Sequence, residues 1–291
     1  MYCFFFSLIF KIQNMNVLSL FDGMSCGQIA LNRAGIKYDN YFASEIKKHA
    51  IKVTQHNYPN TIQLGDVTKI KSEDLPKIDL LIGGSPCQDF SSANKERKGL
   101  NGEKSSLFFE YVRLLKELKP KYFLLENVSM DDYSYQFISE TLGTYPVNIN
   151  SELVSGQLRQ RSYWTNIGHE SFDLFGNRYS MIPQPKDKKI MLQDILESGK
   201  TDRQKSLCIL ARYKTSAPIR EKYEKRYKMG MLQIVYDNEH RLLTTKEIER
   251  LQTVPEGYVD NVPGISENMK ANLLGDGWTV DVIAHIFSFL K

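Results

Sequence analysis

Short apolar runs alternate with amphipathic stretches through the first half of the chain. The apolar runs predict strands at 17–21, 38–44, 61–64, 79–84 and 122–125. Apolar residues at helical spacing predict helices at 27–34, 46–56 and 106–118. Strands and helices that alternate at this spacing are typical of a parallel sheet with helices on both faces. The pattern therefore predicts an α/β fold with a doubly wound, mostly parallel sheet.

The pattern changes after about residue 168. Pro183, Pro185, Gly199 and Pro218 interrupt the chain, and residues of this kind end regular elements. Helical periodicity returns only at 245–251, 268–274 and 280–289. We predict a first domain at 15–168, a smaller second domain at 169–262 and a C-terminal segment at 263–291 that returns to the first domain.

The first residues have a character of their own. Residues 2–10 are almost wholly apolar, but this stretch is too short to cross a bilayer. It also lacks the basic start and the small-residue cleavage site of a signal peptide. We interpret residues 1–14 as an upstream extension and Met15 as the natural start.

Composition and charge narrow the class of protein. Of 291 residues, 42% are hydrophobic and 25% are charged, which excludes a disordered chain, a collagen-like fibre and a multi-span membrane protein. Residues 200–228 hold 10 Lys/Arg against 3 Asp/Glu, although the whole chain carries only +4. A basic segment on a neutral body is what a module that binds a polyanion requires. A solvated charged face is the alternative interpretation.

The four cysteines are Cys3, Cys26, Cys87 and Cys208. None forms a C-x-x-C pair, so no zinc knuckle or dithiol redox motif is indicated. Unclustered cysteines in a chain of this length are typical of reduced thiols in a cytosolic protein. We expect no metal site.

Polar residues follow the predicted strands, where an open α/β sheet binds its ligands. A glycine-containing turn at 21–27 follows the first strand, Glu45 ends the second and Asp66 follows the third. Such a turn can leave amide donors free for a ligand, and Glu45 stands where an acid accepts hydrogen bonds from ribose hydroxyls. Helix capping is the alternative role for both acids.

A cysteine and a carboxylate follow the next two strands. Cys87 stands in a loop shaped by glycine and proline, and Glu126 follows the neighbouring strand. A structural cysteine is usually buried inside an element, whereas Cys87 lies where ligands bind. A thiol and a carboxylate without a paired histidine do not form a protease site.

Six motifs in this order resemble those of the DNA cytosine-5 methyltransferases. They are Phe21-Asp22-Gly23, Ser85-Pro86-Cys87-Gln88, Glu126-Asn127-Val128, Gln157-Leu158-Arg159-Gln160-Arg161, 241–252 and 275–280. The sequences at 84–91 and 108–111 are similar to those of the animal de novo branch of this family. The resemblance implies the Rossmann-like fold of S-adenosylmethionine-dependent methyltransferases, with 169–262 as the target recognition domain.

The resemblance also implies a catalytic set. A Cys87 thiolate would attack C6 of cytosine and make C5 reactive. Glu126 would hold N3 and the exocyclic amine, while Arg161 and Arg159 would hold O2 and neighbouring phosphates. The base must leave the helix to reach such a pocket, so base flipping is expected.

The implied cofactor is S-adenosyl-L-methionine. The residues that would surround it are Phe21, Asp22, Gly23, Cys26, Glu45, Ile46, Asp66, Val67, Gly277 and Trp278. The family often has Asn where Asp276 stands here. An acid at that position is expected to lower the affinity for the carboxylate of the cofactor.

Duplex DNA is the implied partner. In the family the loop at 91–106 closes over DNA, and here it carries Lys95, Arg97 and Lys98. An ordinary surface loop is the alternative. In the predicted recognition domain we expect DNA contacts from the side chains of Arg212, Lys214 and Arg220.

The resulting prediction is a DNA (cytosine-5-)-methyltransferase of a restriction–modification system, a phage or another mobile element. We expect a cytoplasmic monomer that uses no metal and no membrane. Two alternatives stay open. The first is the RNA-acting branch of the family. The motif of that branch resembles Pro-Pro-Cys, whereas this chain has Ser85 before Pro86. The second is a catalytically inactive DNA-binding protein.

Overall fold

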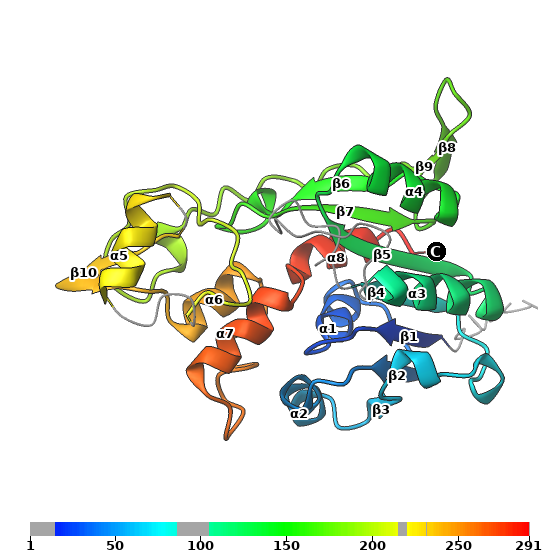
Figure 1. Ribbon diagram of the computed structural model, residues 1–291, viewed down its shortest axis with the longest axis horizontal. Coiled ribbons are helices and arrows are strands. Elements are labelled where there is room, and N and C mark those ends of the chain that lie inside the picture. The colour runs from blue at the N-terminus through cyan, green and yellow to red at the C-terminus, as the bar shows by residue number, and fades with distance from the viewer. Residues whose placement is uncertain (1–14, 86–104, 215–219, 231, 291) are drawn as a thin grey trace, which may run out of the picture.

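The centre of the protein is one seven-stranded sheet (Figure 1). A computed structural model describes residues 15–85, 105–214, 220–230 and 232–290. The strands of the sheet are β1 (Asn16–Leu20), β2 (Asn40–Ser44), β3 (Ile62–Gln63), β4 (Leu80–Gly84), β5 (Tyr122–Val128), β6 (Val147–Asn150) and β7 (Gln160–Thr165). The five strands predicted from the apolar runs are β1 to β5, so this part of the prediction is confirmed.

The strand order is β3-β2-β1-β4-β5-β7-β6. The pairs from β3 to β5 are parallel, whereas β7 pairs antiparallel with both β5 and β6. The chain moves outward in one direction through β2 and β3 and in the other through β4 and β5. The switch point therefore lies between β1 and β4, where open α/β sheets bind ligands at the carboxyl ends of their strands.

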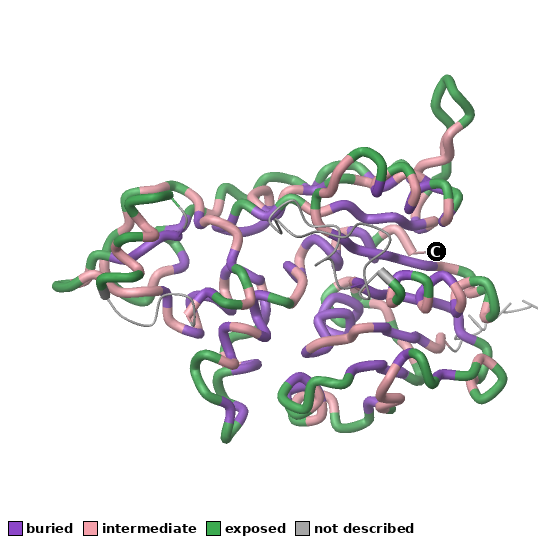
Figure 2. The backbone as a smooth tube through the Cα atoms, in the orientation of Figure 1, coloured by how far each residue is buried: buried purple, intermediate pink, exposed green. Residues whose placement is uncertain are grey.

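Helices α1 (Cys26–Arg33), α2 (Lys48–Asn57) and α8 (Val280–Phe287) pack on one face of the sheet, and α3 (Ser105–Leu118) and α4 (Asp132–Leu142) pack on the other. The helices α5 (Arg220–Lys228), α6 (Thr245–Leu251) and α7 (Glu267–Asp276) lie to the side of the sheet in Figure 1. Side chains along β4 alternate between two cores, because successive residues of a strand point to opposite faces. Leu80 and Ile82 join the core beneath α1 and α8, and Leu81 joins the core beneath α3 and α4. The doubly wound, mostly parallel prediction is thus confirmed, and the central strands are the buried part of the backbone in Figure 2.

Residues 169–241 have little regular structure within the described parts of the chain. The elements are α5, the short 3-10 helix η5 (Gln193–Ile195) and two small hairpins, β8 (Glu170–Phe172) with β9 (Arg178–Ser180) and β10 (Val235–Asp237) with β11 (Glu239–Arg241). The β8–β9 hairpin projects from the body near β6, whereas α5 and β10 lie at the opposite end of the molecule (Figure 1). This region begins where the pattern of apolar and polar positions changes, after about residue 168. The domain bounds stay a prediction.

Two buried carboxylates organise α6 and explain the motif at 241–252. Thr244 and Glu247 form a capping box at the start of the helix. The Glu247 carboxylate also receives both terminal nitrogens of Arg241, at 2.8 and 2.9 Å. Glu249 accepts the backbone N–H groups of residues 257, 259 and 260. These contacts fix the chain on either side of α6.

Among the helices of the described residues, none has the length and apolar character needed to cross a membrane.

Gly27 gives a test of how α1 packs on the sheet. A Cβ atom at this position would lie 2.5 Å from Ile82 Cδ1 and 2.5 Å from the Tyr41 hydroxyl. We expect Gly27→Ala to lower the free energy of unfolding by about 1–3 kcal/mol, because this overpacking outweighs the better helix propensity of alanine. Chemical denaturation measures the change. Asn32→Ala, on the exposed side of the same helix, is the control, and an equally stable Gly27→Ala protein would contradict the close approach.

Candidate functional site

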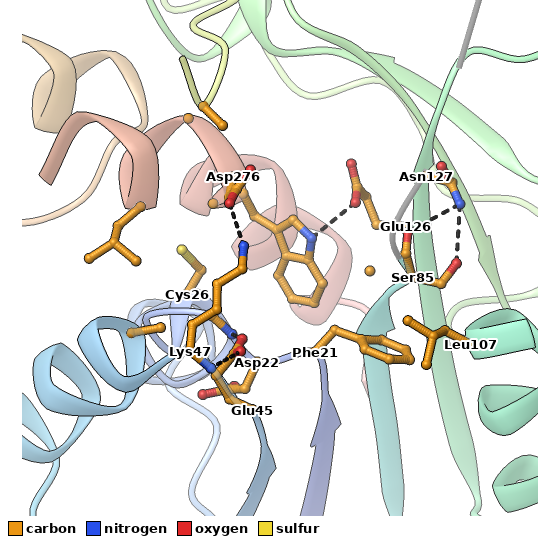
Figure 3. Close-up of a pocket in the computed structure, with 18 of the residues that line it drawn as sticks. Phe21, Asp22, Cys26, Glu45, Lys47, Ser85, Leu107, Glu126, Asn127 and Asp276 are labelled. Carbon is orange, nitrogen blue, oxygen red and sulfur yellow. Dashed lines mark hydrogen bonds and ion pairs between the residues drawn. The ribbon is translucent and has the colours of Figure 1, made fainter. Parts of the chain in front are cut away.

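A cavity of about 490 Å³ opens at the carboxyl ends of β1, β2, β4 and β5 (Figure 3). Thirteen residues singled out from the sequence line this cavity. They are Phe21, Asp22, Gly23, Cys26, Glu45, Ile46, Asp66, Val67, Glu126, Arg159, Arg161, Gly277 and Trp278. The fold therefore brings together residues from six separate stretches of the chain at the switch point of the sheet.

The turn after β1 has an unusual backbone. Phe21, Gly23 and Ser25 have φ values of 58°, 60° and 63°, in the left-handed region that residues other than glycine rarely adopt. Two non-glycine residues held in this region indicate local strain, which is often found at functional sites. The turn directs the ring of Phe21 toward the cavity, beside Leu107 (Figure 3).

Glu45 holds this turn against the end of β2. One carboxylate oxygen accepts the Gly23 N–H at 2.8 Å, and the other accepts the N–H groups of Ile46 and Lys47 at 2.8 Å each. A carboxylate has about four acceptor positions, so Glu45 keeps capacity for one further donor. The interpretation of Glu45 as a cap and the interpretation as a ligand for hydroxyl groups are therefore compatible.

Burial changes the acidity of two groups in the cavity wall. Burial raises the pKa of Asp22 from 3.8 to about 6, against the opposing effect of hydrogen bonds that include those from Ser25 and Tyr41. Burial also raises the pKa of Cys26 to about 12, so this thiol stays neutral at physiological pH. Cys26 contributes shape to the cavity rather than charge.

One part of the cavity wall suits a flat, amine-bearing ring. Ile46 is 71% exposed although it is a large apolar residue, and Val67 is buried nearby in the same wall. Asp66 uses Oδ1 to accept the backbone N–H and the hydroxyl of Thr68. Its Oδ2 has no hydrogen-bond donor within the described residues, so this oxygen is available to a ligand.

Glu126 and Arg161 form a buried pair in a second part of the wall. The Arg161 Nε lies 3.0 Å from one carboxylate oxygen, and the Trp278 indole donates to the other at 3.1 Å. A Cβ atom on Gly84 would lie 3.0 Å from both Glu126 Oε2 and Trp278 Nε1. Glycine at the end of β4 therefore lets the carboxylate and the indole meet without a shift of either side chain.

Ser85 connects this pair to the segment that carries the candidate nucleophile. The Asn127 amide donates to the Ser85 hydroxyl at 3.2 Å, as Figure 3 shows. This contact fixes the last described residue before the loop. Cys87 itself, together with Lys95, Arg97 and Lys98, lies outside the described residues, and the roles predicted for these four side chains stay predictions.

Arg159 is buried, and both terminal nitrogens of its guanidinium group donate hydrogen bonds. It donates to the carbonyls of Ile209, Gly275 and Gly277 and to the Cys208 sulfur, at 2.9–3.3 Å. These partners belong to the strand-poor middle segment and to the end of α7. The geometry makes Arg159 a positioning residue for the cavity wall, and its predicted contact with substrate stays a prediction.

Lys47 is a site residue that sequence reasoning missed. Its ammonium group lies 2.7 Å from a carboxylate oxygen of Asp276, across the cavity (Figure 3). The hydrogen bond and charge of Asp276 outweigh desolvation and raise the pKa of Lys47. The pair offsets the negative charge that the sequence analysis treats as unfavourable at residue 276. The two residues are far apart along the chain, and no local pattern could have indicated their contact.

The three residues predicted to contact DNA from the second domain differ in their placement. Arg212 is exposed, whereas the Lys214 ammonium lies 2.9 Å from Glu267 and 3.3 Å from the Thr245 hydroxyl. Arg220 begins α5, and its side chain lies outside the described part. Lys205 also turns inward, toward three backbone carbonyls. Part of the positive charge at 200–228 is therefore used inside the protein.

Within the parts of the chain that the structure covers, no group of three His, Cys, Asp or Glu side chains is placed to hold a metal ion.

Comparisons with known proteins point to one family. Residues 15–131 match the family model described as C-5 cytosine-specific DNA methylase. The chain is 34% identical over 193 residues to the orphan methyltransferase M.Rho11sI of Bacillus phage rho11s, which covers 64% of this chain and 35% of that protein. It is 34% identical over 210 residues to the type II methyltransferase M.NgoBV of Neisseria gonorrhoeae, which covers 65% of this chain and 48% of that protein.

The chain thus spans about a third to a half of the length of these curated relatives. Among solved structures, the Dnmt2 methyltransferase of S. pombe matches with a TM-score of 0.68 at 19% identity, over 95% of this chain and 98% of that one. At this level of identity the likeness concerns the fold alone.

The raised pKa of Asp22 predicts a pH-dependent effect on stability. Between the unfolded value of 3.8 and the folded value of about 6, the folded protein binds more protons than the unfolded chain, so this group costs stability as the pH rises through that range. We expect Asp22→Asn to gain up to about 3 kcal/mol relative to the parent protein between pH 4 and pH 7. Denaturant unfolding at both pH values measures the difference. Asp39→Asn, at an exposed aspartate, is the control, and a difference that does not change with pH would contradict the burial of Asp22.

Proposed function

The chain belongs to the C-5 cytosine-specific DNA methylase family, and from this premise we propose that it methylates C5 of cytosine in duplex DNA. The observation that carries the proposal is that the residues expected to hold the cofactor and those expected to hold the cytosine line one cavity. Ligand sites of open α/β sheets lie at this same position of the fold.

The cavity fits S-adenosyl-L-methionine. Glu45 has acceptor capacity for one ribose hydroxyl, Ile46 offers an apolar surface for the adenine, and Asp66 Oδ2 is available to its amino group. Phe21 would cover the ring from the other side, and Asp22 would lie by the methionine part. When bound, this cofactor supplies an electrophilic methyl group.

Glu126 and Arg161 are suited to a cytosine that enters the same cavity. Arg161 offers guanidinium donors for O2, and Glu126 offers a carboxylate for N3 and the exocyclic amine. The buried ion pair fixes the two groups relative to each other, so both edges of the ring would be recognised in one orientation. Trp278 holds the far oxygen of Glu126 and limits its movement.

Cys87 would act as the nucleophile. Its sulfur would form a bond to C6, and the electron pair of the C5–C6 double bond would then bond C5 to the methyl group, whose bond to the sulfonium sulfur of the cofactor breaks and leaves its electron pair on that sulfur. Loss of the C5 proton to a base restores the double bond as the C6–S bond breaks and releases the thiolate. The Ser85–Asn127 contact, two residues before Cys87, anchors the start of its loop for this step.

The cytosine must leave the helix to enter the cavity, because the reactive edge of a stacked base cannot reach an interior wall. The loop with Lys95, Arg97 and Lys98 would hold phosphates, and the second domain would hold the rest of the duplex. Arg159 would contribute by holding that domain against the end of α7.

We propose a role in restriction–modification or in a phage or other mobile element, with the protein acting as a monomer in the cytoplasm of a bacterial cell. The support comes from the relatives, which are named as an orphan phage methyltransferase and a type II methyltransferase.

Methyl transfer is the direct test. We expect the purified full chain to transfer label from S-adenosylmethionine to duplex DNA, and bisulfite sequencing to locate it at cytosines. Cys87→Ala should lose at least about a thousandfold in rate, because no other group supplies the sulfur nucleophile, and Glu126→Gln should lose about a hundredfold or more. Both variants should still bind the cofactor in calorimetry.

Cys3→Ala is the matched control, since it removes a thiol from the segment that we interpret as an upstream extension, and it should keep full activity. Transfer to tRNA alone would overturn the choice of DNA. Binding of DNA without any transfer would indicate a catalytically inactive protein, and an active Cys87→Ala variant would refute the covalent step.

The Lys47–Asp276 pair gives a second prediction, about cofactor affinity. Lys47→Met should weaken cofactor binding about threefold, because it leaves the Asp276 charge unpaired near the expected carboxylate of the cofactor. Asp276→Asn, added to Lys47→Met, should restore the affinity. Calorimetric titration of S-adenosylmethionine measures both. Lys48→Met, at an exposed neighbour, is the control, and a double variant as weak as the single one would show that the pair acts otherwise.

A further inference from the structure

The turn at 21–25, which we call the cofactor turn, needs contacts from other segments to keep its backbone. Residues other than glycine stay in the left-handed region only where their surroundings enforce it, and Phe21 and Ser25 both lie there. From the first domain, Glu45 accepts the Gly23 N–H at 2.8 Å. The contacts on this turn therefore decide what fraction of the molecules presents the wall that the cofactor is expected to meet.

A further contact on the cofactor turn comes from the far end of the chain. The Tyr258 hydroxyl donates to the Met24 carbonyl at 2.7 Å, across 234 residues of sequence. Both residues are buried, with 6% of Tyr258 and 1% of Met24 exposed. Burial raises the pKa of Tyr258 well above its usual value of 10.0. The hydroxyl therefore keeps the proton that it donates.

The segment that carries Tyr258 is itself held in place. The Glu249 carboxylate at the end of α6 accepts three backbone N–H groups within 257–260, at 2.7–3.0 Å. From α2, the Asn57 amide donates to the Tyr258 carbonyl at 2.9 Å. The hydroxyl thus reaches the cofactor turn from a backbone that is fixed on both sides, which is what a support for a strained turn requires.

Met24 also meets the C-terminal part of the cavity wall. A Cβ atom on Gly277 would lie 2.8 Å from the Met24 Cε, so glycine lets the two segments touch. The described lining of the cavity includes Gly23 and Gly277 but neither Met24 nor Tyr258. The contact of Tyr258 with Met24 can therefore act on the cofactor only through the cofactor turn.

We propose that Tyr258 is a positioning residue for the cofactor, because its hydrogen bond to Met24 holds the cofactor turn in the backbone that binds S-adenosylmethionine. Without the hydroxyl, a buried carbonyl loses its donor, and the turn gains access to backbones that do not fit the cofactor. The apparent affinity then falls with the fraction of molecules that keeps the competent turn. The inference rests on the proposed function, since it requires S-adenosylmethionine as the cofactor.

The first test is Tyr258→Phe, which keeps the ring and removes only the hydroxyl. Calorimetry should show S-adenosylmethionine binding about five- to tenfold more weakly, as expected for the loss of one buried hydrogen bond. The rate at saturating cofactor should stay within about twofold of the parent rate, because bound cofactor restores the competent turn. A merely structural role would give the opposite result, with a lower rate from a smaller folded fraction and an unchanged affinity.

Tyr213→Phe is the matched control. Tyr213 is also 6% exposed, and its hydroxyl accepts the Leu243 N–H at 3.1 Å, but it lines a second cavity beside α5. This variant should lower the stability to a similar degree and keep the parent affinity for the cofactor. The two variants together separate the contact with the cofactor turn from the general cost of removing a buried hydroxyl.

Hydrogen exchange followed by mass spectrometry gives a second test that needs neither activity nor a variant. Coupling between two sites is reciprocal, so a contact that favours the cofactor must be favoured by the cofactor. In the parent protein, S-adenosylmethionine should slow exchange at 257–260 about fivefold or more, although these residues lie outside the described lining of the cavity. In Tyr258→Phe, exchange at 21–25 should be faster and the slowing at 257–260 should be lost.

Two results would overturn the inference. The first is an unchanged cofactor affinity in a folded Tyr258→Phe protein. The second is exchange at 257–260 of the parent protein that does not respond to the cofactor, and this result decides the question even if the variant does not fold. Failure of the proposed function would look different. A parent protein that binds the cofactor but methylates no duplex DNA would contradict the proposed substrate and leave the test of Tyr258 intact, whereas one that binds no cofactor would overturn both.

Discussion

The hydrogen bonds of a few buried polar side chains are the constraint on which the active-site cavity depends. Arg159 joins the middle segment to the end of α7, and Gln252 joins α6 to the same helix end while it contacts Gln157. Buried groups of this kind must be satisfied, and a satisfied network specifies one arrangement of the segments that it links. The middle segment, α6 and the end of α7 are not joined by a common sheet. These side-chain hydrogen bonds hold them together and so shape one wall of the cavity.

This network explains why the motifs take the residues that they do. Gln157 and Gln252 are long amides that both donate and accept. Gln157 joins the backbone of Ile209 to that of Leu251, and Gln252 joins the Leu274 carbonyl to the Thr279 hydroxyl. Glycine at 84 and 277 allows side chains from other elements to approach within contact distance. Most residues of the cavity wall have such structural roles, and the chemistry that we propose depends on a few groups that include Glu126 and Arg161.

The parallel half of the sheet could be predicted from the sequence, because β1 to β5 are short apolar runs between amphipathic helices. The strand β7 was missed, since Gln160, Arg161 and Ser162 place polar side chains where a buried strand usually has apolar ones. The cavity residues were found through ordered motifs. The Lys47–Asp276 pair and the orientation of Lys214 were not, because contacts between distant residues leave no mark in local composition.

The packing of α8 against α1 bears on how the protein comes to be made. These helices, Cys26–Arg33 and Val280–Phe287, are neighbours in the core although almost the whole chain separates them. Contacts of such large sequence separation form late and slow the search for the native state. During synthesis, the face of the sheet beneath α1 therefore stays partly uncovered until α8 has been made, and in that interval it is most exposed to aggregation and to chaperones.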